Sequence, residues 1–171
     1  MTTRPFRDHP LSKDDAAVLL IDHQSGLISL VQDHSPAEFR DSVLALADVA
    51  RFFALPTIPT TSFEDGPNGP LVPELKEGFP EAPDIARPGQ ISAWGNEDLV
   101  QAEVFVVNDA SGTFNTSVRD AALDRMSAAG AQLMNWYSVA CELHRDWRND
   151  LEGLGARRSD QIPNYRNRVT S

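Results

Sequence analysis

The sequence is poor in cysteine and in positive charge. Cys141 is the only thiol among 171 residues, which excludes an internal disulfide framework and suits a reducing cytosol. Lys and Arg number 15 against 25 Asp and Glu, so the formal net charge is −10. Nucleic-acid binding depends on clustered basic side chains. We therefore expect a cytoplasmic protein without a nucleic-acid partner, whose negative charge serves solubility.

Long apolar runs are also missing. No run approaches the roughly 18 residues of a membrane-spanning helix. The N-terminal stretch MTTRPFRDHPLSKDD lacks the apolar core of a secretory signal. Hydrophobic residues still make up 41% of the chain, which at this length can build one domain with a core. We predict a single domain over residues 1–171 that does not enter a membrane.

Short apolar runs bounded by turn residues are predicted as strands. The run at Ala16–Asp22 is continuous, which is typical of a strand buried on both faces of a parallel sheet. Three further strands are predicted at Thr57–Phe63, Glu103–Val107 and Ala131–Tyr137. A short strand within PDIARP would carry Arg87.

Helical patterns lie between these runs. Ser35 begins a capping box, with Pro36 at the first helical position and Glu38 three residues after the cap. The apolar residues behind this box share one helical face and are Phe39, Val43, Leu46, Ala50 and Phe53. The alternation of strands and helices predicts an α/β layer fold with a mainly parallel sheet.

Two more helices are predicted in the second half of the chain. One runs from about Thr116 to Ala129, with Gly130 just past its end. The other has Ser138 as its predicted cap. Its apolar face consists of Ala140, Leu143, Trp147 and Leu151.

Two stretches interrupt this alternation. The segment from 64 to 89 is rich in Pro and Gly, and loops of that length are usually functional or disordered. A helix opened by Asn96 then meets the strand at Glu103 with no Gly, Pro, Asn or Ser near the join of Ala102 and Glu103. Helix-to-strand connections normally need a few residues, so this join is anomalous.

Two charged residues are candidates for a site. In parallel α/β sheets, ligands bind beyond the carboxyl ends of the strands. Asp22 lies at that position on the first strand, where it is either a site residue or a helix or loop cap. Arg87 would lie near it, and the alternative for Arg87 is a surface ion pair of small energetic worth.

Cys141 is the only possible thiol nucleophile. A position about three residues after Ser138 could lower its pKa, whereas the carboxylate of Glu142 would raise it. A lone cysteine near the start of a helix is more often a small core residue, and we do not expect Cys141 to be catalytic.

Metal and nucleotide cofactors are not predicted. The four histidines are His9, His23, His34 and His144. They form no HxxxH or HxH pair, and a zinc site needs three or four converging ligands. No GxGxxG follows a strand, and GPNGP lacks the Lys-Ser/Thr end of a phosphate cradle.

Five long stretches carry a family resemblance: DAAVLLIDHQSGLISLV, LPTIPTTSFEDGPNGPLVPELKEGFPEAPDIARPGQISAW, VFVVNDASGTFN, AGAQLMNWYSVACELHRDWRND and IPNYRN. Together they resemble the isochorismatase-like cysteine hydrolases, in particular their YcaC-like bacterial subgroup, over nearly the whole chain. The resemblance implies a Rossmann-like three-layer αβα fold around a parallel sheet of six strands. It also implies a homo-oligomer of eight subunits and a small amide- or ester-like substrate.

The resemblance also implies a set of catalytic residues. Asp22 matches the family's aspartate, and Arg87 in ARPG matches a basic residue that is lysine in most of the family. In the family a cysteine thiolate attacks an amide-like carbonyl and the aspartate accepts the thiol proton. Backbone N–H groups beside a cis peptide bond hold the oxyanion.

One part of the family pattern is missing. The nucleophile lies in a GVVTEVCV-like segment that this sequence lacks. The resemblance places the gap between Ala102 and Glu103, where about 30 residues, one strand and one helix, are absent. Cys141 matches a different, non-catalytic cysteine. The resemblance thus implies five strands and either an inactive hydrolase or a non-catalytic subunit or binding module. The chain is either discontinuous at this join or pairs Ala16–Ile21 directly with Glu103–Val107, and we expect the direct pairing.

Overall fold

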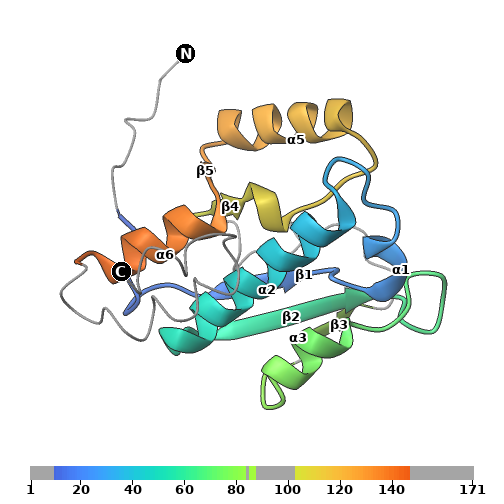
Figure 1. Cartoon of the computed structure of the whole chain (residues 1–171), viewed down its shortest axis with the longest axis horizontal. Coiled ribbons are helices and arrows are strands. Elements are labelled where there is room, and N and C mark those ends of the chain that lie inside the picture. The colour runs from blue at the N-terminus through green and yellow to red at the C-terminus, as the bar shows by residue number, and fades with distance from the viewer. Residues whose placement is uncertain (1–9, 84, 88–102, 147–171) are drawn as a thin grey trace, which may run out of the picture.

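The structure is a computed structural model that describes residues 10–83, 85–87 and 103–146 (Figure 1). Its elements are β1 (Val18–Ile21), α1 (Ser25–Ile28), α2 (Pro36–Phe52), β2 (Thr57–Ser62), α3 (Pro73–Gly78), β3 (Ile85–Arg87), β4 (Phe105–Val107), the 3-10 helix η2 (Asn108–Ala110), α5 (Thr116–Ala128), β5 (Gln132–Met134) and α6 (Trp136–His144). The three strand pairs are all parallel, which confirms the predicted α/β class. No helix within these ranges is long and apolar enough to cross a membrane.

The first sheet has the order β1-β2-β3. Val18 of β1 lies opposite Thr57 of β2, and the β2–β3 pairing begins only at Thr60. Pro59 has no N–H to donate, and in the alternation of β2 it belongs to the side of β3. Because β3 starts one residue later, this proline interrupts no ladder hydrogen bond.

Helix α2 covers one face of this sheet and carries much of the core (Figure 1). The predicted cap is confirmed, since Ser35 Oγ accepts a hydrogen bond from Glu38 N at 3.3 Å. The predicted stripe is buried at four of its five positions, and Phe53 forms the C-terminal cap as a partly buried residue. Apolar residues of α2 pack with Leu20 of β1, which is 1% exposed, and with Leu75 of α3.

The second half of the described chain forms a separate two-stranded sheet, β4-β5. Helix α5 connects the two strands and ends before Gly130, whose φ of +97° confirms the predicted glycine stop. None of the α5 residues is buried, although a crossover helix normally packs one face on its sheet. Helix α6 follows β5 and contacts α2 on the covered side of the first sheet (Figure 1).

The start of α6 corrects one prediction. Asn135, not Ser138, is the cap, because Asn135 Oδ1 accepts a hydrogen bond from Ser138 N at 2.7 Å. Both residue types are good caps, and only the tertiary structure decides where the strand before the helix ends. Ala140 and Leu143 are buried as predicted, whereas Trp147 and Leu151 lie outside the described residues.

The Pro- and Gly-rich stretch is more regular than the sequence suggests. It contains α3, with Pro73 at the helix start, and the predicted short strand β3. Both elements are shorter than the windows in which hydrophobic periodicity is measurable. The fold of this stretch therefore depends on contacts with α2 and β2.

The largest departure from expectation concerns the sheet. Five strands are described, but β1 and β4 are not hydrogen-bonded to each other, so the predicted direct pairing is wrong. The strand at Val18–Ile21 is also not buried on both faces, because Leu19 is 36% and Ile21 40% exposed. The helix predicted from Asn96 and the join at Ala102 lie outside the described residues.

The position of the α6 cap can be tested by a matched pair of substitutions. Asn135→Ala removes the acceptor of a helix-terminal N–H and should lower the free energy of unfolding by about 1 kcal/mol. Ser138→Ala removes a hydroxyl from the first turn and should change it by less than about 0.5 kcal/mol. Urea unfolding followed by circular dichroism measures both. A larger loss for Ser138→Ala would contradict the assigned cap.

Candidate active site at the carboxyl edge of the first sheet

Asp22 follows β1 directly, at the edge where ligands bind in parallel sheets. Its N–H donates to Thr60 O at 2.9 Å, so the backbone is still held by β2. The φ of Asp22 is +56°, in the left-handed region that non-glycine residues rarely adopt. The chain therefore turns sharply here and leaves the Asp22 side chain partly buried at the sheet edge.

A second left-handed residue ends the neighbouring strand. Phe63 follows β2 with a φ of +50° and is 59% exposed. A β-carbon on Gly66 would lie 2.2 Å from the Phe63 ring, so the ring packs directly against this glycine. Two adjacent strands thus end in strained turns, and such strain is concentrated at functional sites.

Gln24 holds the turn after β1 in place. It is fully buried, and its Oε1 accepts from Ser62 N at 2.8 Å. Its Nε2 donates to Ser62 O at 3.0 Å and to Gly69 O. One side chain therefore joins the ends of β1 and β2 to the loop at Gly69. Nothing in the sequence distinguishes this glutamine from a surface one, and we did not predict it.

The loop over this edge lies very close to the chain after Gln24. Ser25 N donates to Pro70 O at 2.9 Å, and Gly26 N donates to Asn68 O at 2.8 Å. A β-carbon on Gly26 would lie 2.1 Å from Pro67 O, so a larger residue would displace the loop. The carboxyl edge is accordingly formed by a tightly packed turn and loop.

His23 links the two sheets at their carboxyl ends. Its Nε2 lies 3.0 Å from Ala110 O in η2, which follows β4. Because a carbonyl can only accept, Nε2 carries the proton. Burial lowers the pKa of His23, against the opposing effects of the Ala110 carbonyl and the Asp22 charge, so the ring is neutral at pH 7. Its Nδ1 is buried without a hydrogen-bond partner among the described residues.

Further polar groups lie beyond β4. Burial raises the pKa of Asp109, while the hydrogen bond from Trp136 N, at 3.0 Å, opposes this shift. Asp33 Oδ1 accepts from Thr113 N at 2.8 Å, and its other oxygen lies 3.6 Å from His34 Nε2. Asp109 lies two residues after β4, and the sequence analysis did not single it out.

Arg87 is the last residue of β3 and lies opposite Ser62 at the end of β2. Its backbone therefore lies at the same carboxyl edge as Asp22, with β2 between them. The structure thus places the backbones of the two residues on strands separated by β2, and their functional proximity stays a prediction. The position of the Arg87 side chain lies outside the described part of the structure.

Cys141 is not part of this edge. It is the sixth residue of α6, beyond the first turn in which a helix N-terminus acts on a thiol. The residues next to it contact the segment that precedes β1: Glu142 Oε2 accepts from Leu11 N at 3.0 Å, and Arg145 Nη2 donates to Leu11 O at 3.4 Å. The second half of α6 is thus directed toward the amino edge of the sheet, away from Asp22.

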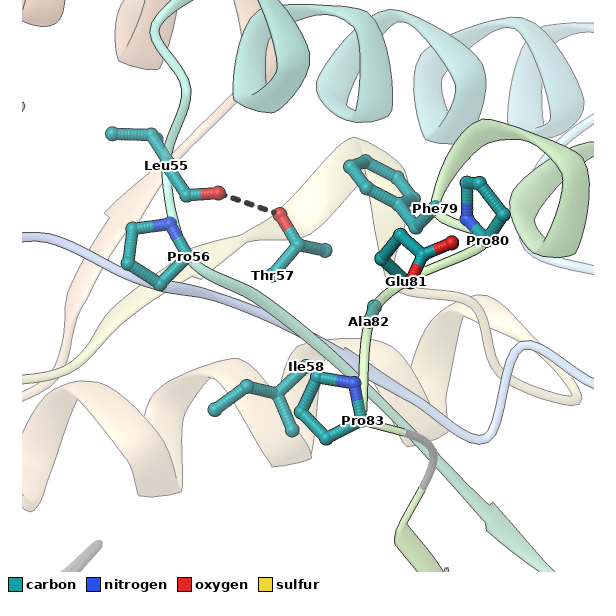
Figure 2. Close-up of a pocket in the computed structure, with 9 residues that line it drawn as sticks. All are labelled: Leu55, Pro56, Thr57, Ile58, Phe79, Pro80, Glu81, Ala82 and Pro83. Carbon is teal, nitrogen blue, oxygen red and sulfur yellow. Dashed lines mark hydrogen bonds between the residues drawn. The ribbon is translucent and has the colours of Figure 1, made fainter.

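A hollow of about 470 Å³ lies at the amino edge of β2 (Figure 2). It is lined by Leu55–Ile58 and Phe79–Pro83, and its walls are mostly apolar. Figure 2 shows the Thr57 hydroxyl donating to Leu55 O, at 3.1 Å, instead of facing a ligand. The hollow lies at the opposite end of β2 from Asp22 and brings no catalytic group together.

Two other expectations concern metals and the oxyanion site. Among the described residues, no three His, Cys, Asp or Glu side chains converge to hold a metal ion. The peptide bonds described are all trans, so the cis peptide that the family resemblance implies is not found in this part of the chain.

The chain is similar to proteins from several bacteria. It is 56% identical over 193 residues to "Probable hydrolase YcaC" of Escherichia coli, covering 94% of this chain and 93% of that protein. A crystal structure of the Escherichia coli protein, described as an octameric hydrolase of unknown specificity, superimposes with a TM-score of 0.90 at 54% identity and covers 98% of this chain and 97% of that one.

Two further structures define the relationship. YcaC from Pseudomonas aeruginosa with hexane-2,5-diol and covalent acrylamide is 58% identical, with a TM-score of 0.91 over 96% of this chain and 98% of that one. An isochorismatase family protein from Burkholderia thailandensis shares the fold at 18% identity, with a TM-score of 0.58 over 75% of this chain and 95% of that one. No family model matches the chain. The identity and coverage of the YcaC proteins show that this chain belongs to the isochorismatase-like hydrolases, in their YcaC-like subgroup, and has their Rossmann-like αβα fold.

Proposed function

We propose that this chain derives from an isochorismatase-family cysteine hydrolase that acts on small amide- or ester-like substrates. We also propose that the chain by itself is inactive, because its nucleophilic cysteine is absent. One observation carries the proposal: the only cysteine lies in α6, beyond its first turn, and the residue after it, Glu142, accepts a hydrogen bond from Leu11 in the segment before β1. Asp22 and Arg87 can accept a proton and stabilise charge, but neither replaces a thiolate in this mechanism.

In the complete reaction a thiol would lie within hydrogen-bond reach of Asp22. The carboxylate would take the thiol proton as sulfur bonds to the substrate carbonyl, and the leaving amine or alcohol would then receive that proton. We assign Asp22 this role of base, and Arg87 the role of stabilising negative charge at the same edge. Strain at Asp22 supports the assignment, because strained residues persist where function requires them.

The comparison with relatives supports the proposal that this chain lacks a segment that the relatives have. The alignment with the Escherichia coli protein spans 193 residues, more than the 171 of this chain, so it includes positions that have no counterpart here. The structure of the Pseudomonas aeruginosa protein carries covalent acrylamide, an electrophile that adds to thiolates. We infer that the unmatched positions include the nucleophile.

The alternative is a non-catalytic subunit or small-molecule binding module that retains the family fold. The hydrogen bonds from the buried Gln24 side chain to Ser62 favour this binding-module reading. They hold the carboxyl edge firmly, and such an edge can bind a ligand without a nucleophile. The two candidates differ in chemistry: a hydrolase completed by another segment turns substrate over, whereas a binding module does not.

The absence of a nucleophile can be tested by activity. Loss of a catalytic nucleophile lowers kcat by several powers of ten, so the chain should hydrolyse a panel of small amides and esters at the rate of buffer alone. Cys141→Ser should leave that rate unchanged. Hydrolysis that Cys141→Ser abolishes would make Cys141 the nucleophile and the proposal wrong.

The strained conformation of Asp22 can be tested by stability. Asp22→Gly and Asp22→Ala both remove the carboxylate, but only glycine adopts a positive φ without strain. Asp22→Gly should therefore be more stable than Asp22→Ala by about 1 kcal/mol. Urea unfolding measures the difference. Equal stability of the two variants would mean that residue 22 is not left-handed in solution.

Assembly is a further expectation. Because the Escherichia coli relative is described as octameric and this chain contains the sequence CELHRDW, we propose a homo-oligomer of the same eight-subunit type. Sedimentation velocity at micromolar concentration should show a species well above the monomer mass. A folded chain that sediments only as a monomer would contradict this.

A further inference from the structure

We propose that the hydrogen bond between His23 and Ala110 is an acid-sensitive latch: protonation of the His23 ring breaks it and opens the edge that holds Asp22. The proposal goes beyond the hydrolase function, because it concerns the described carboxyl edge whether or not a thiol completes it. It rests on two observations, the contact of His23 Nε2 with Ala110 O and the buried Nδ1 of the same ring.

The latch joins two segments that are far apart in the sequence. His23 lies in the turn after β1, and Ala110 lies 87 residues later, at the end of η2. Nε2 and the carbonyl oxygen are 3.0 Å apart, and Ala110 is 3% exposed. Among the described strands, β1, β2 and β3 form one sheet, and β4 pairs only with β5. The latch is therefore a polar link between the carboxyl ends of two sheets that share no described ladder.

The surroundings of the ring suit its neutral form. Because Nε2 carries the proton that Ala110 O accepts, the neutral ring has only a lone pair at Nδ1. Nδ1 is buried and has no hydrogen-bond partner among the described residues, although His23 as a whole residue is partly exposed. Burial lowers the pKa of His23 from its ordinary value of 6.5. This effect outweighs the Ala110 carbonyl and the Asp22 charge, which act in the opposite direction.

Protonation removes this fit. The second proton is placed on Nδ1, which becomes a buried donor without a described acceptor, and the ring gains a charge away from water. Both costs disappear when the ring turns to solvent, and a ring that turns to solvent no longer reaches Ala110 O. The charged form of His23 thus favours the open latch.

The carboxylates on the two sides of the latch do not offset this cost. Asp22 is next to His23 in the sequence, and its effect on the ring is smaller than that of burial. In η2, Asp109 Oδ1 already accepts from Trp136 N at 3.0 Å. Burial raises the pKa of Asp109, which reduces its negative charge in mild acid.

Other charged groups around the latch lie close to partners of opposite charge. Val72 N donates to the carbonyl of the latch histidine at 3.1 Å, which brings the start of α3 against this turn. The acid at that helix start, Glu74, pairs with Arg40 at 2.9 Å. In the loop before α2, a carboxylate oxygen of Asp33 lies 3.6 Å from His34 Nε2. None of these four side chains contributes to the pKa shift of the latch histidine.

The response to pH has one direction. The unfolded chain takes up the proton near pH 6.5, whereas the folded chain with the latch closed takes it up only at lower pH. The contribution of the closed latch to stability is therefore complete above pH 6.5 and is lost as the pH falls through the lowered pKa. The edge that holds Asp22 is closed at neutral pH and opens in mild acid.

Amide hydrogen exchange of the full chain, measured by NMR between about pH 7.5 and about pH 5 and corrected for the intrinsic pH dependence of exchange, tests the latch. Val72 N, which donates to His23 O, reports on one side. Trp136 N, which donates to Asp109 Oδ1, reports on the other. The opening of both should increase about tenfold or more in acid. Val18 N, which is hydrogen-bonded at the amino end of β1, should change by less than about twofold.

Two matched variants separate His23 from other groups that titrate. His23→Gln keeps an N–H donor for Ala110 O but cannot ionise, so it should fold at neutral pH and lose the acid step. His34→Gln removes the histidine beside Asp33 and should keep the step. In the wild-type chain, the midpoint of the His23 ring titration should coincide with the midpoint of the opening, and this comparison requires no variant.

An acid step that persists in His23→Gln would overturn the proposal and assign the titration to another group, such as Asp109. Loss of the step in His34→Gln would overturn it as well. The same holds for titration of the His23 ring without a change in exchange, and for opening that reaches Val18 to the same extent, which would mean unfolding of the whole domain. None of these measurements uses hydrolysis, so none bears on the proposed hydrolase function.

Discussion

The need of every strand N–H and C=O for a partner is the constraint on which the rest of this structure depends. β1 meets it on the side of β2 and leaves Leu19 and Ile21 facing an edge without a described strand. In a parallel sheet a continuous apolar strand is normally interior, paired on both edges and covered on both faces. Among the described strands β1 lies at the edge of its sheet, and Leu19 and Ile21, which alternate with the buried Leu20, are exposed on one of its faces.

The two sheets nevertheless keep the arrangement of the family without pairing to each other. Helix α2 contributes the most buried residues to the core and contacts both α6 and η2. Burial of that apolar surface is worth about 25 cal/mol per Å² and is indifferent to whether the strands beneath it are hydrogen-bonded. The His23–Ala110 hydrogen bond then fixes the carboxyl ends relative to one another. Side-chain packing on α2 thus keeps the two sheets in place relative to each other, although no described backbone hydrogen bonds join their strands.

At the carboxyl edge of the first sheet, hydrogen bonds from a buried side chain offset backbone strain. Asp22 and Phe63 hold positive φ angles that are unfavourable for their side chains. Gln24 offsets this strain by satisfying both the N–H and the C=O of Ser62 from a fully buried position. A strained turn held by a buried brace is typical of a site that must present a carboxylate in one orientation. The described part of this edge that contains Asp22 is therefore firmly held, and the only cysteine of the chain, Cys141, lies on α6.

Local sequence determined the elements of this protein, and tertiary structure determined how they combine. The capping box at Ser35, the stripe behind it and the glycine stop at Gly130 depend on neighbours within a few residues, and the structure has them where the sequence predicts. The choice of Asn135 over Ser138 as a cap, and the burial of Gln24, depend on where distant segments end, which no local pattern contains. The sequence also indicated an anomaly between Ala102 and Glu103, yet it suggested that the flanking strands would close the gap. Among the described strands they do not: β1 pairs only with β2 and β4 only with β5, because strand pairing depends on where distant segments pack and no local pattern contains that information.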